Sequence, residues 1–202
     1  VSDTSHITPL GMVILDNVAP VRPGAALAAI GRSARSHTSF FDAHPQSEGL
    51  VRLLRSLAYE PSLFDESAAL IARFAQSKTA SNNTGDAVSV FKSLFYIYLS
   101  GTHAPPRQRA DFLRKLASEA TAGNPALVLT ALDAMLECGR FSSSYGFEFG
   151  TRKRDYGYSP TTVHEQSAWY AETFSLAEDL ARMPALRNPV RSMLAKQLRY
   201  LA

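Results

Sequence analysis

The chain has 202 residues, of which 46% are hydrophobic and 19% are charged, a balance typical of globular rather than disordered proteins. Its formal net charge is +3, and its one cysteine, Cys138, excludes an internal disulfide framework and fits a cytoplasmic protein. The longest apolar run, Val88 to Leu99, is interrupted by polar residues, and no apolar signal-peptide core follows Val1. We therefore expect neither a membrane span nor a secretory signal.

Apolar residues recur at the helical spacing of three and four positions along almost the whole chain. Helix-start signals agree with this spacing: Thr162 with Glu165 forms one capping box, and Ser62 with Asp65 indicates a second. The pattern predicts nine helices, near residues 5–18, 23–35, 46–59, 62–77, 85–100, 106–121, 125–138, 162–182 and 188–201.

The expected fold is all-α. Short connectors favour antiparallel neighbouring helices, and the sequence LLRSLA at 53–58 resembles FLRKLA at 112–117, which indicates a degenerate repeat. We predict a single domain over residues 1–202, an antiparallel helical-repeat α-solenoid of the HEAT/TPR-like kind. A compact helical bundle is the alternative.

Residues 141–160 break the helical pattern. Aromatic residues alternate with other residues on both sides of a basic run, which favours a β-hairpin-like insertion. In a recognition element, the rings would stack on a partner while the basic side chains hold an anion. In the alternative, the insertion is a flap that folds back over the helices. The candidate binding residues are Tyr145, Phe147, Phe149, Arg152, Lys153, Arg154, Tyr156 and Tyr158.

The sequence contains no phosphate-binding loop, dinucleotide fingerprint or nucleophile elbow. His164 and its neighbour begin like a zinc-protease helix, but Ala168 stands where the second histidine would be needed. Cys138 ends an apolar helix and is interpreted as a core residue. We expect no catalytic residue, metal or cofactor. A hydrolase that uses Ser142–Ser144, His103 or His164 is a third, less favoured hypothesis.

Charged residues elsewhere are interpreted as solvated helix faces. They include the adjacent carboxylates Asp65 and Glu66, which point in different directions on a helix, and the basic residues Arg107, Arg109, Arg114 and Lys115. From Arg182 onward the chain has five basic residues and no acidic one, so its last helix could also face an acidic partner.

The runs FSS at 141–143, FEFG at 147–150 and RDYG at 154–157, together with Arg152, resemble an element of large bacterial STAND-class proteins. These are signal-transducing P-loop NTPases, often implicated in anti-phage defence. Residues 82–83 and 91–104 resemble the same region, so that the resemblance spans about residues 50–170. It implies a helical-repeat region that acts as a sensor or scaffold within a longer protein. It carries no catalytic signature, and NTPase activity is not implied for this chain.

These observations predict a non-catalytic helical module that recognises a protein partner, or a neighbouring domain of the same chain, through the 141–160 insertion. The alternative is a nucleic-acid-binding module that contacts phosphates through residues 152–154 and the basic C-terminal helix. Phosphate contacts would make its affinity fall steeply with salt.

Overall fold

The computed structural model describes residues 3–37, 39–42, 44–77, 84–119, 125–139, 141–143, 145–151 and 153–201, without the side chains of 84–86 and 198–201. Within these ranges the chain is all-helical and forms no strand, which confirms the predicted all-α class. The helices are α1 (Pro9–Val18), α2 (Pro23–Ser36), α3 (Ser47–Leu57), α4 (Pro61–Gln76), α5 (Thr84–Ser93), α6 (Pro106–Ser118), α7 (Pro125–Met135), α8 (Val163–Arg182) and α9 (Arg187–Leu201).

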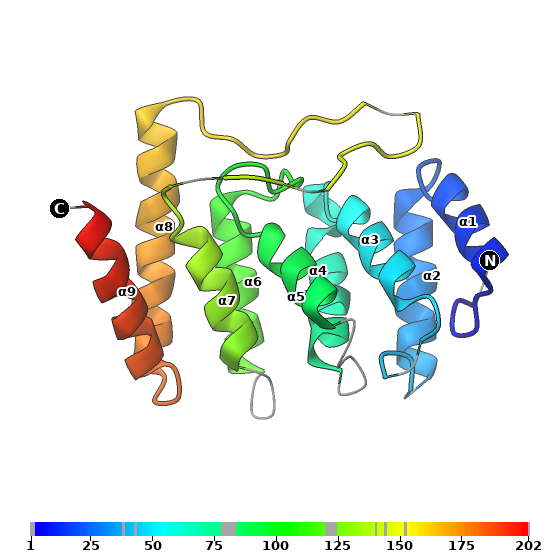
Figure 1. Cartoon of the computed structure of the whole chain (residues 1–202), viewed down its shortest axis with the longest axis horizontal. Coiled ribbons are helices and arrows are strands. Elements are labelled where there is room, and N and C mark those ends of the chain that lie inside the picture. Colours follow the sequence, from blue (N-terminus) through cyan, green and yellow to red (C-terminus); the bar gives the residue numbers. More distant parts are fainter. Residues whose placement is uncertain are drawn as a thin grey trace.

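The helices follow one another across the molecule in chain order, from α1 at one end to α9 at the other (Figure 1). Two rows result. The odd-numbered helices pack in succession, α1 on α3, α3 on α5, α5 on α7 and α7 on α9. In the second row α2 packs on α4, and α6 packs on α8. Within the described residues, the backbones of α4 and α6 make no such extended contact. The backbones of α4 and α6 are therefore spaced more widely than those of the other neighbours in the row, and side chains such as Phe64 and Phe112 bridge them.

Proline and capping residues fix several helix starts. Thr162 caps α8, and the side chain of Glu165 reaches back to the Thr162 backbone, so this predicted capping box is confirmed. The box predicted at Ser62 is wrong, because Pro61 already occupies the first position of α4 and moves the N-cap to Glu60. Proline at the first helical position loses no intrahelical hydrogen bond, since that amide has no partner in any helix.

The core runs through both rows. Phe64 of α4, Phe91 of α5, Phe112 of α6 and the neighbouring Phe95 form a group of buried rings with centroids 5.0–6.3 Å apart. Trp169 of α8 is also fully buried, and its indole N–H donates to the carbonyl oxygen of Met135 at 2.9 Å. The apolar spacing found in the sequence thus identifies residues that the fold buries.

Helix α5 is shorter than predicted. The sequence predicts a helix to residue 100, but α5 ends at Ser93, and residues 94–104 form an irregular connection with positive φ at Leu99 and Gly101. The carbonyl groups of Leu94 and Tyr96 accept hydrogen bonds from the Arg109 side chain instead of helical amides. A tertiary contact therefore overrides the local apolar pattern.

Residues 141–161, which we call the crossing loop, leave the end of α7, run across the helix ends toward α1 and α2, and return to α8 (Figure 1). The loop turns at Gly150, which has φ of 62° and lies against Pro20 between α1 and α2. It has one isolated bridge residue, Phe149, and the predicted β-hairpin is not confirmed in the described residues. Backbone groups at Tyr156 and Tyr158 bond to Gly101 and Thr102 rather than across the loop.

We predict that Phe95→Ala lowers the free energy of unfolding by about 3–5 kcal/mol, because the lost ring leaves a cavity in the group of buried rings. The matched control is Phe174→Ala on α8, since that ring is exposed and its removal should cost less than about 1 kcal/mol. Urea titration followed by circular dichroism measures both. Equal losses would contradict the core assignment.

Candidate functional site

Arg109 anchors the irregular connection beneath the crossing loop. This side chain of α6 is fully buried, and its guanidinium donates to the carbonyl oxygens of Ala104 (2.8 Å), Leu94 and Tyr96 (both 2.9 Å) and Thr102 (3.1 Å). Among the described residues it has no carboxylate partner. Burial lowers its pKa to about 9, so the group stays charged at neutral pH. The prediction that Arg109 lies on a solvated face is wrong.

The buried guanidinium of Arg109 is also covered by aromatic rings. Its central carbon lies 5.1 Å from the ring centroid of Trp169 and 5.8 Å from that of Tyr158, and these two rings stack on each other. Tyr158 belongs to the crossing loop, and its N–H donates to the carbonyl oxygen of Thr102 at 2.7 Å. Arg109 and the crossing loop therefore share Thr102 as an acceptor.

Two further arginines hold the crossing loop. Arg55 of α3 is buried, stacks against Tyr145 at 4.3 Å and Phe147 at 5.2 Å, and donates to the carbonyl oxygen of Gly146 at 3.4 Å. Desolvation lowers its pKa to about 10. Its Nη2 atom is buried without a hydrogen-bond partner. Stacking on two rings offsets part of the cost of burying this charge.

Arg154, from the loop itself, makes the reciprocal contact with the helices. Its guanidinium lies 4.2 Å from the ring centroid of Tyr59 and 4.3 Å from that of Phe149. It donates to the carbonyl oxygen of Ser56 at 2.6 Å, near the C-terminal end of α3, where a cation is electrostatically favourable.

Asp155 ties the same part of the loop to two neighbouring side chains. Its Oδ1 lies 2.9 Å from His103 Nε2 and accepts hydrogen bonds from the Tyr59 hydroxyl at 3.0 Å and the Gly157 N–H at 2.9 Å. Desolvation would raise the pKa of Asp155, but these hydrogen bonds and the charge of His103 outweigh it and lower the pKa. These contacts join the return half of the loop to Tyr59 and His103.

The structure gives most of the predicted binding residues contacts within the molecule. Tyr145, Phe147, Arg154 and Tyr158 contact Arg55, Tyr59, Arg109 or Trp169 of the helical part, and the buried ring of Phe149 contacts Arg154. Lys153 and Tyr156 are exposed, Tyr156 by 60%. Arg152 lies outside the described residues. The loop therefore lies against the helices, as the flap alternative predicts, and does not project as a ribbon. Arg154 departs from that alternative, which placed the charges of the loop in water, because its guanidinium contacts two rings. Recognition through its exposed residues stays a prediction.

Sequence reasoning missed the buried arginines. A signal for Arg109 was present, because Phe112, Leu113 and Leu116 follow it at three, four and seven positions and share its helix face. Arg107, two residues earlier, has the opposite environment, since its side chain is 84% exposed. Cys138 was also misplaced: α7 ends at Met135, and the thiol lies beyond the helix and is exposed.

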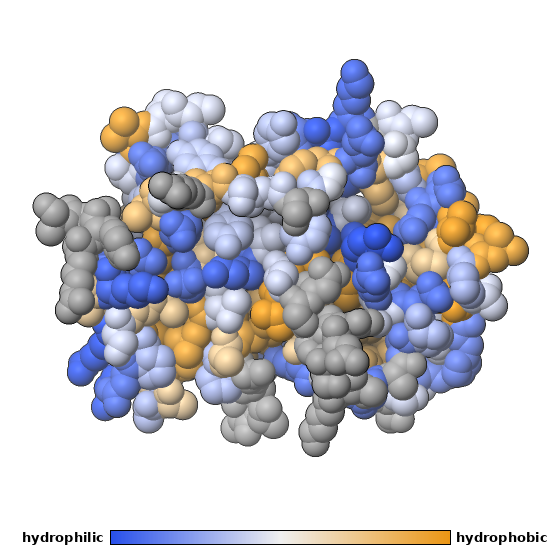
Figure 2. Space-filling view, viewed as in Figure 1, coloured by the Kyte–Doolittle hydropathy of each residue, from blue (hydrophilic) through white to orange (hydrophobic). Residues whose placement is uncertain are grey.

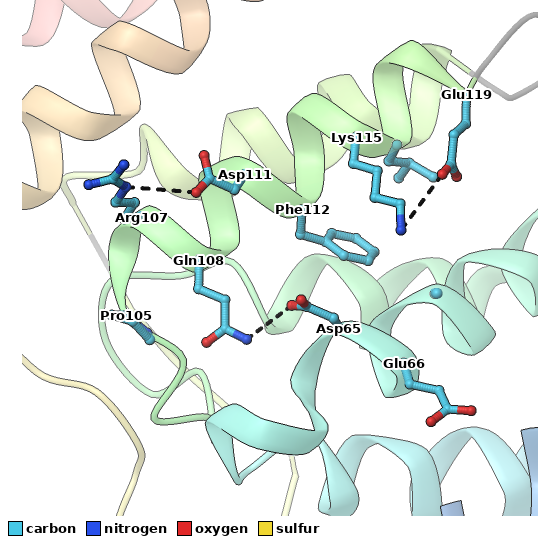
Figure 3. A pocket seen from close by; sticks show the side chains of 11 residues that line it. Asp65, Glu66, Pro105, Arg107, Gln108, Asp111, Phe112, Lys115 and Glu119 are labelled. Carbon is cyan, nitrogen blue, oxygen red and sulfur yellow. Dashed lines mark hydrogen bonds and ion pairs between the residues drawn. The ribbon is translucent and has the colours of Figure 1, made fainter. Parts of the chain in front are cut away.

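The opening between α4 and α6 forms a groove with a volume of about 780 Å³ (Figure 3). The ring of Phe112 lies between the two helices (Figure 3). Leu116 and Ala69 also line the groove and add to this apolar floor. At the first turns of both helices, the side-chain amide of Gln108 donates to the Pro61 carbonyl oxygen at 2.8 Å and to Asp65 at 3.0 Å. The helices are therefore joined at one end of the groove.

Charged side chains border the groove on both sides. The α4 border carries Asp65 and Glu66, whereas α6 carries two exposed ion pairs, Arg107 with Asp111 and Lys115 with Glu119, each at 3.8 Å. Such exposed pairs contribute at most about 1 kcal/mol each and rearrange easily. Of the acidic pair that was predicted to be solvated, Asp65 points toward Gln108 of α6, whereas Glu66 points away from α6 and pairs with Arg35 of α2 at 3.5 Å (Figure 3).

In the part of the chain that the structure describes, no group of three or more His, Cys, Asp or Glu side chains could hold a metal ion. None of the described helices is long and apolar enough to cross a membrane. The groove combines apolar area with exposed ion pairs, a combination found at surfaces that bind other proteins.

Comparisons of the chain with models of protein families, with curated proteins and with solved structures found no match. The resemblance to the helical region of STAND-class NTPases therefore stays a prediction.

We predict that Arg109→Met lowers the free energy of unfolding by about 3 kcal/mol. Each buried carbonyl left without a donor costs about 1–3 kcal/mol, partly offset because no charge is then desolvated. Arg107→Met on the exposed side of the same helix should change stability by less than about 0.5 kcal/mol. Urea unfolding measures the difference, and identical midpoints would contradict the anchoring role of Arg109.

We predict that Gly157→Ala detaches the return half of the crossing loop. Gly157 has φ of 84°, which costs other residues about 1–2 kcal/mol, and a Cβ atom there would collide with the Thr102 backbone. Amide hydrogen exchange at Tyr158 should then accelerate, since this N–H bonds to Thr102. Gly146→Ala is the control, because a Cβ at Gly146 meets no atom within 4 Å. Unchanged exchange in Gly157→Ala would refute the docking described here.

Proposed function

We propose that this chain is a non-catalytic helical-repeat scaffold of the α-solenoid kind, which binds a helix of a protein partner in the groove between α4 and α6. Three features support the solenoid arrangement: the order of the helices along the molecule, the successive packing of the odd-numbered helices, and a core shared between neighbours. The partner helix would lie between α4 and α6 in the second row.

The observation that carries the proposal is the groove itself, whose apolar floor lies where α4 and α6 lack the close backbone contact of the other neighbours in the row. One turn of an α-helix is about 5.4 Å long and about 10 Å wide, roughly 400 Å³, so a groove of about 780 Å³ fits about two turns. Binding a helix by its apolar face in such a groove is a common mode of peptide recognition.

The borders of the groove define the chemistry of the partner helix. Its apolar face would contact Phe112, Leu116 and Ala69, and basic side chains on the edge nearest α4 would face Asp65. The mixed pairs on α6 can re-form with either charge on the opposite edge. We therefore infer an amphipathic helix that is basic along one edge.

A displayed library of amphipathic helices, selected on the wild-type chain, tests the proposal. Helices enriched on the wild type should bind at least about tenfold more weakly to Ala69→Trp, whose side chain fills the exposed floor position of the groove. The matched control is Ala168→Trp, which adds the same side chain at an exposed position of α8 away from the groove. Enriched helices should also show Lys or Arg along one edge.

Equal binding to the wild type and Ala69→Trp, or failure to enrich any helix, would refute the groove as the site. The double variant Lys153→Ala/Tyr156→Ala removes the two exposed predicted residues of the crossing loop. Loss of binding in that variant, with normal binding to Ala69→Trp, would instead place recognition on the loop.

A further inference from the structure

Helix α1 is apolar on two faces. Its inner face places Met12 and Leu15 in the core. Its outer face carries Leu10, Val13, Ile14 and Val18, which share one side of the helix because they are spaced by three, four and eight positions. Val21, in the turn after the helix, is exposed as well. The five side chains, which we call the α1 stripe, are between 47% and 72% exposed.

The α1 stripe differs from the rest of the described surface. Among the described residues eight large hydrophobic side chains are exposed, and five of them form this stripe, whereas Tyr156, Val163 and Phe174 are scattered. Apolar colour gathers at the α1 end of the molecule in Figure 2. Asn17 lies on the same side of the helix, where its amide donates to the Val13 carbonyl oxygen. Single exposed apolar residues are ordinary, but a group of them on a helix whose opposite face is already buried indicates a surface covered in the functional state.

We propose that the α1 stripe is the interface of a symmetric dimer, in which two copies of this chain pack α1 against α1 in antiparallel orientation. A twofold axis near Ile14 would place Leu10 of each copy beside Val18 of the other, since both lie four residues from Ile14. The stripe is then complementary to itself, as an isologous interface requires.

The charges of α1 favour a second copy over a foreign partner. Asp16 is the one charged residue of this helix, and it lies with Arg52 and Glu48 in the hollow between α1 and the start of α3. The stripe itself contains no charged residue, so two copies meet without like-charge repulsion. It also offers no charge that a different protein could recognise through a complementary charge.

The exposed area of the α1 stripe sets the expected affinity of the dimer. Its side chains expose on the order of 100 Å² each, so a symmetric pair buries roughly 1,000 Å², the lower limit for a specific interface. We therefore expect a dimer with a dissociation constant in the micromolar range, in reversible exchange with the monomer.

Sedimentation velocity of the wild-type chain, from about 1 µM to about 200 µM, should show the shift from monomer to dimer. Leu10→Glu should weaken the dimer at least about tenfold while keeping the fold, because an acidic residue in the first turn suits the helix dipole. The matched control is Val163→Glu, in the first turn of α8 and 81% exposed, which should dimerise like the wild type. Val18→Lys, in the last turn of α1, is a second disrupting variant of the same design.

Cross-linking tests the antiparallel geometry. In a Cys138→Ser background, which removes the exposed native thiol, Ile14→Cys should form a disulfide-linked dimer on oxidation, whereas Val163→Cys should not. A wild-type chain that stays monomeric at about 200 µM would overturn the proposal. A dimer that survives both Leu10→Glu and Val18→Lys, or one that Ile14→Cys does not trap, would overturn it as well.

Discussion

A single desolvated cation, the guanidinium of Arg109, fixes the part of this fold that regular helix packing leaves undetermined. Removing a charge from water costs several kcal/mol, and here no carboxylate compensates it among the described residues. Four carbonyl oxygens and two aromatic rings do so instead. All four oxygens come from residues 94–104. The cation can be satisfied only if that segment leaves the helical path, and this is why α5 ends at Ser93.

The crossing loop depends on the same arrangement. The Thr102 carbonyl oxygen accepts from both Arg109 and the Tyr158 amide, and Tyr158 stacks on Trp169 above the guanidinium. Arg55 and Arg154 repeat the principle farther along, each pairing a guanidinium with two rings and a backbone carbonyl. The loop is thus held by cation–π and backbone contacts, which tolerate irregular geometry better than a strand ladder does.

This use of the loop has a functional consequence. Rings and cations that contact the helix ends are not available to a ligand, which leaves Lys153 and Tyr156 as the exposed predicted residues of the loop. Two further surfaces suited to binding lie elsewhere. One is the groove between α4 and α6, where the two backbones are more widely spaced, and the other is the α1 stripe at the end of the first row. They differ in chemistry: the groove borders are charged, whereas the stripe is not. This difference suits a foreign helix in the first case and a second copy in the second.

The sequence by itself determined the all-α class, the approximate bounds of the helices and most of the core, because helical spacing is a local property that few tertiary contacts override. It also marked residues 141–160 as exceptional, and it left their role open. Only the tertiary structure decided which arginines are buried: Arg107 and Arg109 are two positions apart on one helix, and only the second meets carbonyls and rings from distant segments. The opening between α4 and α6 also arises from the packing of whole helices, which no local pattern of residues encodes.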